Sequence, residues 1–162
     1  NSLTEELKAA EPEQADYFEA NRNDYIKKLD TLEAAVIKTI STLPEEQRIL
    51  VTAHDAFNYF GKEYDFEVIG LQGLSTATEA GVQDVQNLSK FIIENKVKAI
   101  FVESSVPKRT IEALQQSVKS KGFNVEIGGT LYSDALGNKG TVEGTYIGMF
   151  SYNVNTIVNA LK

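Results

Sequence analysis

Cysteine is absent from this chain of 162 residues, and a single histidine, His54, supplies its only imidazole. The absence of cysteine excludes disulfides, zinc–thiolate sites and a cysteine nucleophile. Basic residues are also few, since 16 Lys and Arg stand against 23 Asp and Glu, for a formal net charge of −7. No Lys/Arg cluster is available to displace the counterions of a phosphate backbone, so we expect no nucleic-acid partner. No run of about 18 apolar residues exists, and no transmembrane helix is predicted.

An initiating methionine is missing as well, because the chain begins at Asn1 and enters a helical pattern almost at once. We therefore expect a processed or truncated product. What is present is an ordinary globular composition, with 42% hydrophobic and 24% charged residues. A chain of this length can bury a core of its own.

Glycine and proline are absent from residues 13 to 43, and this stretch predicts one long helix. Pro12 suits the first turn, and Pro44 ends the helix. About 31 residues at about 1.5 Å each make a rod of roughly 45 Å, which is as long as a domain of this size is wide. We predict an amino-terminal helical segment at residues 1–43, with the long helix at about 12–43, followed by an α/β unit at residues 44–162. The apolar stripe of the long helix consists of Phe18, Tyr25, Leu29, Leu32, Val36, Ile40 and Leu43.

Four short apolar runs in the rest of the chain predict β-strands, and amphipathic stretches between them predict helices. Strands that alternate with helices form a parallel sheet with helices on its faces. The predicted fold class is therefore α/β, a four-stranded parallel sheet flanked by helices, with a strand order that the sequence leaves open. The last strand is expected to stop at Gly128-Gly129, with Leu131-Tyr132 beyond the break. Predicted strands are residues 48–52, 67–71, 98–103 and 124–127; predicted helices are 55–64, one beginning at 81 or 84, 109–121, and 143 or 145 to 161, with a polar loop at 72–78.

Polar side chains follow three of the predicted strands. His54 comes after the first strand, Glu103-Ser104-Ser105 ends the third, and Asp134 follows the fourth. The carboxyl ends of parallel strands share one edge of a sheet, so these groups could converge there. Each also has a structural explanation. His54 could be a hydrogen-bonded core residue, Asp134 a turn residue, and Glu103 the partner of a nearby Lys or Arg.

Four segments carry a resemblance to a known family: VTAHDAFNYFGKEY, GLQGLSTATEAGVQDV, IFVESSVPKRTIEAL, and LYSDALG with EGTYIGMFSYNVNTIV. In order and over nearly the whole chain, they resemble the carboxy-terminal lobe of the solute-binding proteins of manganese/zinc ABC transporters, the cluster A-I metal-binding lipoproteins. The resemblance implies two α/β lobes joined by one long, rigid helix, with a divalent cation held between the lobes by four side chains. Two ligands, usually His, belong to the amino-terminal lobe. The other two match His54 and Asp134.

The resemblance implies half of an extracytoplasmic receptor that binds Mn²⁺ or Zn²⁺ and delivers it to the membrane permease of an ABC importer. The complete protein would be a membrane-anchored lipoprotein or a periplasmic protein, and not an enzyme. Because the amino-terminal lobe is absent, we expect weak or no metal binding by the isolated lobe, and a homodimer through its exposed helix or cleft face. An imidazole and a carboxylate suit either metal. Glu103, Ser104 and Ser105 could orient the ligands from behind.

The sequence also bears on three other functions. The chain could be an autonomous or truncated interaction module that binds no metal. His54, Asp134 and Ser104 or Ser105 form a nominal hydrolase triad, but VESSVP lacks the G-x-S-x-G of a nucleophile elbow. Nucleotide binding is disfavoured because no strand is followed by G-x-G-x-x-G or a P-loop.

Overall fold

The computed structural model of this protein describes residues 2–72 and 81–162. Its internal contacts divide the chain into two compact units, Asn1–Val36 and Ile37–Lys162. The boundary falls inside the long helix α2 (Ala15–Ile40), which begins in the first unit and ends in the second. Among the described residues, no helix is both long and apolar enough to cross a membrane.

The long amino-terminal helix is confirmed, with ends that differ slightly from the prediction. Pro12–Gln14 forms a 3₁₀ turn, as is common at the start of a helix. At the other end α2 stops at Ile40, because the hydroxyls of Ser41 and Thr42 donate to the carbonyls of Lys38 and Thr39. Such local hydrogen bonds compete with continuation of the helix.

The first unit also contains the short helix α1 (Ser2–Ala10), which is joined to the start of α2 by ion pairs around Glu19. Lys8 Nζ lies 3.3 Å from one carboxylate oxygen of Glu19, and Arg22 Nη2 lies 3.0 Å from the other. The hydrogen bond and the charge of Lys8, together with Arg22, hold the pKa of Glu19 below its ordinary value. These pairs are solvent-accessible, so they orient α1 more than they stabilise it.

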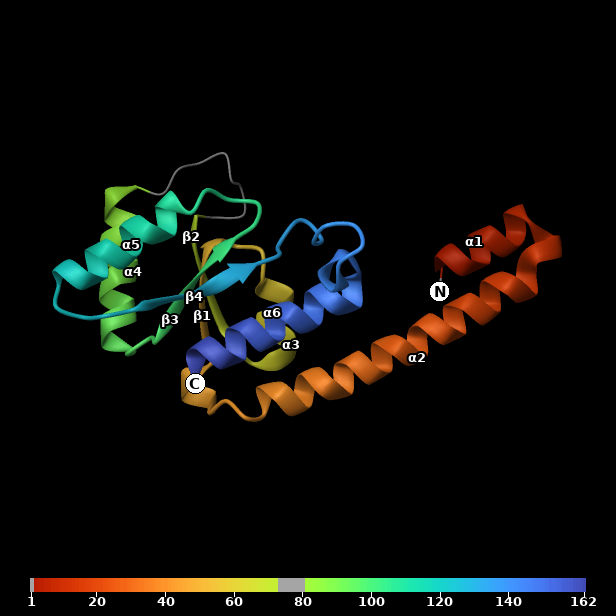
Figure 1. The fold of residues 1–162 in the computed structure, drawn as a ribbon, viewed down its shortest axis with the longest axis horizontal. Helices are drawn as coiled ribbons and strands as arrows, with labels where there is room; N and C mark the ends of the chain where they lie inside the picture. Colours follow the sequence, from red (N-terminus) through yellow and green to blue (C-terminus); the bar gives the residue numbers. More distant parts are fainter. Residues whose placement is uncertain (1, 73–80) are drawn as a thin grey trace. The chain divides into compact units, whose positions relative to one another are not determined.

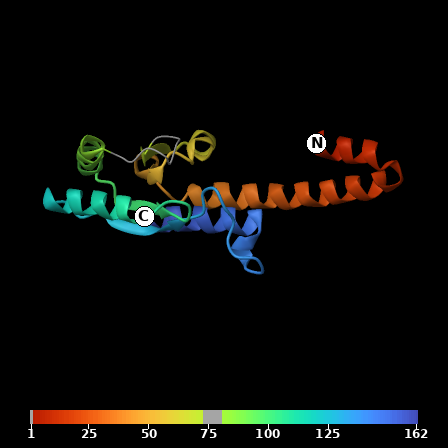
Figure 2. The same ribbon diagram turned by 90° about the horizontal axis from the view of Figure 1, so that it is seen from above.

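The second unit is built on a four-stranded parallel sheet, as predicted. Its strand order is β2-β1-β3-β4. Two short 3₁₀ turns, Glu45–Gln47 and Val142–Gly144, precede β1 and the last helix. In both views α4 and α5 lie on one side of the sheet, and α3 and α6 lie on the other (Figure 1, Figure 2). The elements are β1 (Ile49–His54), α3 (Asn58–Tyr64), β2 (Glu67–Gln72), α4 (Val82–Glu94), β3 (Ala99–Glu103), α5 (Arg109–Ser120), β4 (Glu126–Leu131) and α6 (Tyr146–Leu161).

Alternation along the strands decides which side chains can meet. Val51 and Ala53 of β1, with Ile100 and Val102 of β3, belong to the core that α4 and α5 cover. Successive side chains of a strand point to opposite faces, so His54 and Glu103 belong to the other face. The pairing of Val51 with Ile100 places His54 and Glu103 at the same level of neighbouring strands. The apolar pattern of the strands therefore sends both polar side chains to the α6 side.

Several predicted boundaries were wrong by a few residues. β1 continues through His54, and α3 begins at Asn58 instead of 55, because Ala56 N–H turns back to the carbonyl of His54. The predicted loop at 72–78 lies outside the described residues except for Gln72, which ends β2.

The predicted break at Gly128-Gly129 is also wrong, because β4 runs through both glycines. Ile127 pairs with Ile100 and Gly129 pairs with Phe101, so Gly128 is an extra residue in a bulge. Gly129 has a φ of +147°, a value that side chains rarely adopt. Beyond the bulge the ladder resumes, and Leu131 pairs with Glu103.

Gly128→Ala should destabilise the protein by about 1–3 kcal/mol through overpacking. A Cβ at this position would lie 2.6 Å from Ala160 Cβ of α6 and 2.7 Å from Phe101 Cε1. Urea unfolding measures the loss. The control is Gly81→Ala, where the added Cβ would meet only Asp84 Oδ2 at 3.2 Å, and a much smaller change is expected. Equal losses in the two variants would refute the packing explanation.

Candidate metal centre

His54 is held at the carboxyl end of β1, where it is only 4% exposed. The hydroxyl of Thr52 donates to the main-chain carbonyl of His54 at 2.9 Å, and the N–H of Ala56 donates to the same carbonyl at 3.1 Å. These two bonds satisfy the carbonyl where the ladder stops. The backbone of His54 is thereby fixed, and its ring has few ways to turn.

Glu103 binds His54 twice from the neighbouring strand. Its side chain is fully buried, and Oε1 accepts the main-chain N–H of His54 at 2.9 Å. Oε2 lies 2.7 Å from His54 Nδ1, although neither of these two atoms makes a hydrogen bond of good geometry. We treat this second contact as electrostatic, because the distance is short while the alignment is poor. A carboxylate at Nδ1 favours the tautomer that leaves Nε2 with its lone pair.

Among the described residues, Glu103 has no Lys or Arg partner, which was one of the explanations left open by the sequence. Within the part of the chain that the structure describes, the ion pair of Glu103 is the one with His54. A buried carboxylate without a cationic side chain is costly unless it is hydrogen-bonded. The buried position of Glu103 is therefore explained by its two contacts with His54, one to the main-chain N–H and one to Nδ1 of the ring.

Asp134 meets the opposite side of the imidazole. Its Oδ2 lies 3.2 Å from His54 Nε2, and its side chain is 62% exposed. The predicted convergence of these two residues is confirmed. Two ligands that each lie about 2.1 Å from a tetrahedral metal are about 3.4 Å apart, which is close to the observed separation. The pair therefore has the spacing of two ligands that share one ion.

Comparison with known proteins places the chain in a family. The family model described as "Zinc-uptake complex component A periplasmic" (ZnuA) matches residues 1–160. This chain belongs to the ZnuA family. Members are solute-binding proteins and not enzymes, as the sequence predicts.

The relatives of this ZnuA-family chain are longer than it is. It is 51% identical over 162 residues to the manganese-binding lipoprotein MntA of Bacillus subtilis, covering 100% of this chain and 53% of MntA. It is 54% identical over 137 residues to the zinc-binding protein TroA of Treponema pallidum, covering 85% of this chain and 44% of TroA. The solved structure of periplasmic zinc-binding TroA superposes with a TM-score of 0.95 at 49% identity, covering 99% of this chain and 58% of that one. The chain thus spans about half the length of the curated relatives it matches.

The serines that follow Glu103 do not reach His54. Ser104 is exposed, and its N–H continues the ladder by donating to the carbonyl of Leu131 at 2.9 Å. Ser105 is exposed too, and its hydroxyl lies 2.6 Å from that of Ser133. Both ring nitrogens of His54 face carboxylates, so the nominal triad of this ZnuA-family chain lacks a contact between nucleophile and base.

The sequence analysis missed Asn153 of α6. This residue is 6% exposed; its Oδ1 accepts the N–H of Tyr132 at 3.0 Å, and its Nδ2 donates to the carbonyl of Tyr132 at 2.7 Å. A signal was available, because Asn153 interrupts the buried stripe of α6 between Met149 and Ile157. A polar residue on a buried helical face needs a hydrogen-bond partner, and here the partner is main chain next to a candidate ligand.

Gln72 is a second polar residue that the sequence analysis missed. It pairs with His54 in the register of β2 and β1 and is 8% exposed, and its Oε1 is buried without a hydrogen-bond partner. Within residues 2–72 and 81–162, no third His, Asp, Glu or Cys joins His54 and Asp134 in a metal-binding group. The described residues therefore supply two candidate ligands.

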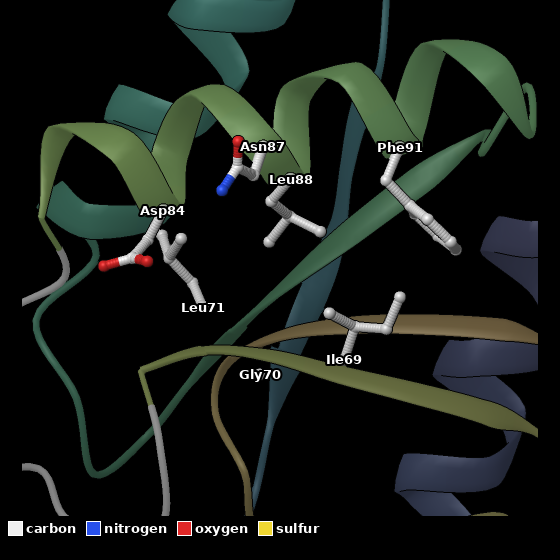
Figure 3. Close-up of a pocket in the computed structure, with 7 residues that line it drawn as sticks. All are labelled: Ile69, Gly70, Leu71, Asp84, Asn87, Leu88 and Phe91. Atoms are coloured by element: carbon white, nitrogen blue, oxygen red, sulfur yellow. The ribbon is translucent and has the colours of Figure 1, made fainter.

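Hollows of the described residues lie on both faces of the sheet, away from the candidate metal centre. One, of about 210 Å³, lies between α3 and α6 beside Ser133, and half of the residues that line it are aromatic. Another, of about 370 Å³, lies between β2 and α4 on the face away from His54 (Figure 3). Its one acidic group, Asp84, accepts the N–H of Gly81 at 2.9 Å and so caps α4.

Proposed function

We propose that this chain forms the half of a transition-metal receptor that supplies His54 and Asp134 as ligands to Mn²⁺ or Zn²⁺. The observation that carries the proposal is the 3.2 Å separation of His54 Nε2 and Asp134 Oδ2, with Glu103 buried behind the ring. A carboxylate behind a ligating histidine is a regular feature of metal sites, because it fixes the tautomer and the ring plane. The cation is cargo, held without chemical change.

Two ligands leave a transition-metal ion with open positions. In a protein of the relatives' full length, the remaining ligands would come from the half that residues 1–162 do not match. In this chain alone water would fill those positions, and no second surface would exclude solvent. We therefore infer that the isolated chain binds metal far more weakly than the complete receptor.

The ligand pair does not choose between the two metals. One nitrogen and one carboxylate oxygen suit both Mn²⁺ and Zn²⁺, and selectivity depends on the whole ligand set and its geometry. The relatives do not choose between the metals either, since MntA is named for manganese and TroA for zinc. Selection would then lie with the ligands contributed by the rest of the receptor.

The role as a receptor implies a location and a partner. Because the family description names a periplasmic component of an uptake complex and MntA is named a lipoprotein, we infer an extracytoplasmic protein, free or lipid-anchored. It would hand its cation to the membrane permease of an ABC importer. The homodimer expected from the sequence, through the exposed helix or the cleft face, stays a prediction. On the helix it would use Phe18, Tyr17 and Tyr25, and the two tyrosines are 61% and 45% exposed.

Calorimetric titration with Mn²⁺ and Zn²⁺ tests the proposal. The protein at its full natural length should bind one ion tightly, whereas the 162-residue chain should bind far more weakly. A full-length protein that binds neither ion would contradict the proposal and favour an interaction module without metal.

A further inference from the structure

Asp134 lies in an exposed loop, yet a metal ligand must be held in place. The loop starts where β4 ends at Leu131, and Tyr132 and Ser133 are the only residues between the strand and Asp134. β4 is an edge strand, paired with β3 on one side only. In the part of the chain that the structure describes, no strand therefore lies on the outer side of Tyr132 to bind its main chain.

The side chain of Asn153 makes the two hydrogen bonds that a neighbouring strand would otherwise make with Tyr132. Its side-chain amide presents one acceptor and one donor, and it pairs with both the N–H and the carbonyl of Tyr132 at 3.0 and 2.7 Å. The amide is buried in α6, where its nitrogen also lies 3.5 Å from the sulfur of Met149. Because both bonds are partly shielded from water by the buried Asn153 side chain, this two-bond contact is harder to open than an exposed one.

A second contact holds the next residue. The hydroxyls of Ser105, in the turn after β3, and Ser133 lie 2.6 Å apart. The two residues before Asp134 are thus held from two different elements, Tyr132 by a partly buried contact and Ser133 by an exposed one. Glu103, two residues before Ser105, holds the other ligand, His54.

We propose that Asn153 is a positioning residue for Asp134, fixing through Tyr132 the loop that presents this carboxylate to the metal. The inference rests on the proposed function and deepens it, because metal affinity would then depend on how α6 packs against the loop. Removing Asn153 frees Tyr132 and leaves only the exposed contact between Ser105 and Ser133 to hold the loop, so that the Asp134 carboxylate samples positions away from His54 Nε2. Supporting groups of this kind typically contribute 10- to 100-fold to metal affinity.

The test compares Asn153→Ala with Asn155→Ala, a control in the same helix whose side chain is exposed. In the protein at its full natural length, Asn153→Ala should weaken Mn²⁺ and Zn²⁺ binding by about 10- to 100-fold, and Asn155→Ala should leave it unchanged. In an Asp134→Ala background, Asn153→Ala should cause no further loss, because its effect passes through Asp134. An equal loss in that background would show a merely structural role and overturn the proposal.

A second readout needs no metal. Amide hydrogen exchange of the 162-residue chain should show Tyr132 N–H protected in the wild type and released in Asn153→Ala, while the amides of β3 stay protected. If Asn153→Ala does not fold, Ser105→Ala removes the exposed contact without disturbing the core, and a smaller but measurable loss of affinity is expected. Unchanged affinity in every folded variant overturns the positioning role. A wild type that binds neither ion instead defeats the proposed function, even where the exchange result confirms the contact itself.

Discussion

His54→Ala and Asp134→Ala should each weaken Mn²⁺ and Zn²⁺ binding by more than the 10- to 100-fold expected for loss of a supporting group. Each substitution removes an atom that would bond to the ion, His54 Nε2 or Asp134 Oδ2, which lie 3.2 Å apart. Within these 162 residues no other imidazole can take over from His54, because it is their one histidine. Calorimetry on the protein at its full natural length measures the effect.

The matched control for the lost carboxylate is Asp84→Asn. Asp84 caps α4 on the face of the sheet away from His54, so metal affinity should be unchanged in this variant. Circular dichroism of each variant checks that the fold persists. Tight binding that survives both His54→Ala and Asp134→Ala would mean that the metal site lies elsewhere.

The second large effect is expected at Glu103, where two substitutions separate ligand orientation from stability. Glu103→Gln can keep the hydrogen bond that Oε1 accepts from His54 N–H at 2.9 Å. It places an NH₂ group against His54 Nδ1, only 2.7 Å away, and two donors then face each other. The ring must turn or change tautomer, and Nε2 loses the lone pair that a metal needs. We expect metal affinity to fall by about 10- to 100-fold.

The two variants Glu103→Gln and Glu103→Leu should differ in their free energy of unfolding. Glu103→Gln retains a buried acceptor for the main chain, so the free energy of unfolding of the metal-free protein should change little. Glu103→Leu leaves the N–H of His54 buried without a partner, which costs about 1–3 kcal/mol. Urea unfolding and calorimetry on both variants separate the two roles. Wild-type metal affinity in Glu103→Gln would show that the carboxylate does not orient the ring.

Much of the fold could be read from local patterns. The absence of Gly and Pro from residues 13 to 43 predicted α2, and short apolar runs located all four strands. The errors lie where the conformation of the backbone departs from what the residue pattern predicts. Gly128-Gly129 looked like a stop signal, but a bulge carries the strand through both residues. Glycine permits a bulge and a chain break equally well, so composition could not distinguish them.

The candidate site was predictable in part. His54, Glu103 and Asp134 stood out because polar groups at strand ends are conspicuous after buried apolar runs, whereas the ligand roles of His54 and Asp134 came from the family resemblance. Glu103 was one of three candidate supporting residues, and the sequence could not rank it above Ser104 and Ser105. The structure does so, because Glu103 contacts His54 while Ser105 contacts Ser133.

By itself the sequence determined the α/β class, the parallel sheet and the long helix, because hydrophobic periodicity and helix-breaking residues act over a few neighbouring positions. Only the tertiary structure decided the order β2-β1-β3-β4, which places β3 beside β1 and so brings Glu103 to His54 across 49 residues of chain. It also decided the pairing of Asn153 with Tyr132, 21 residues away. Contacts between residues so far apart depend on how whole elements pack, and local sequence patterns do not predict that packing.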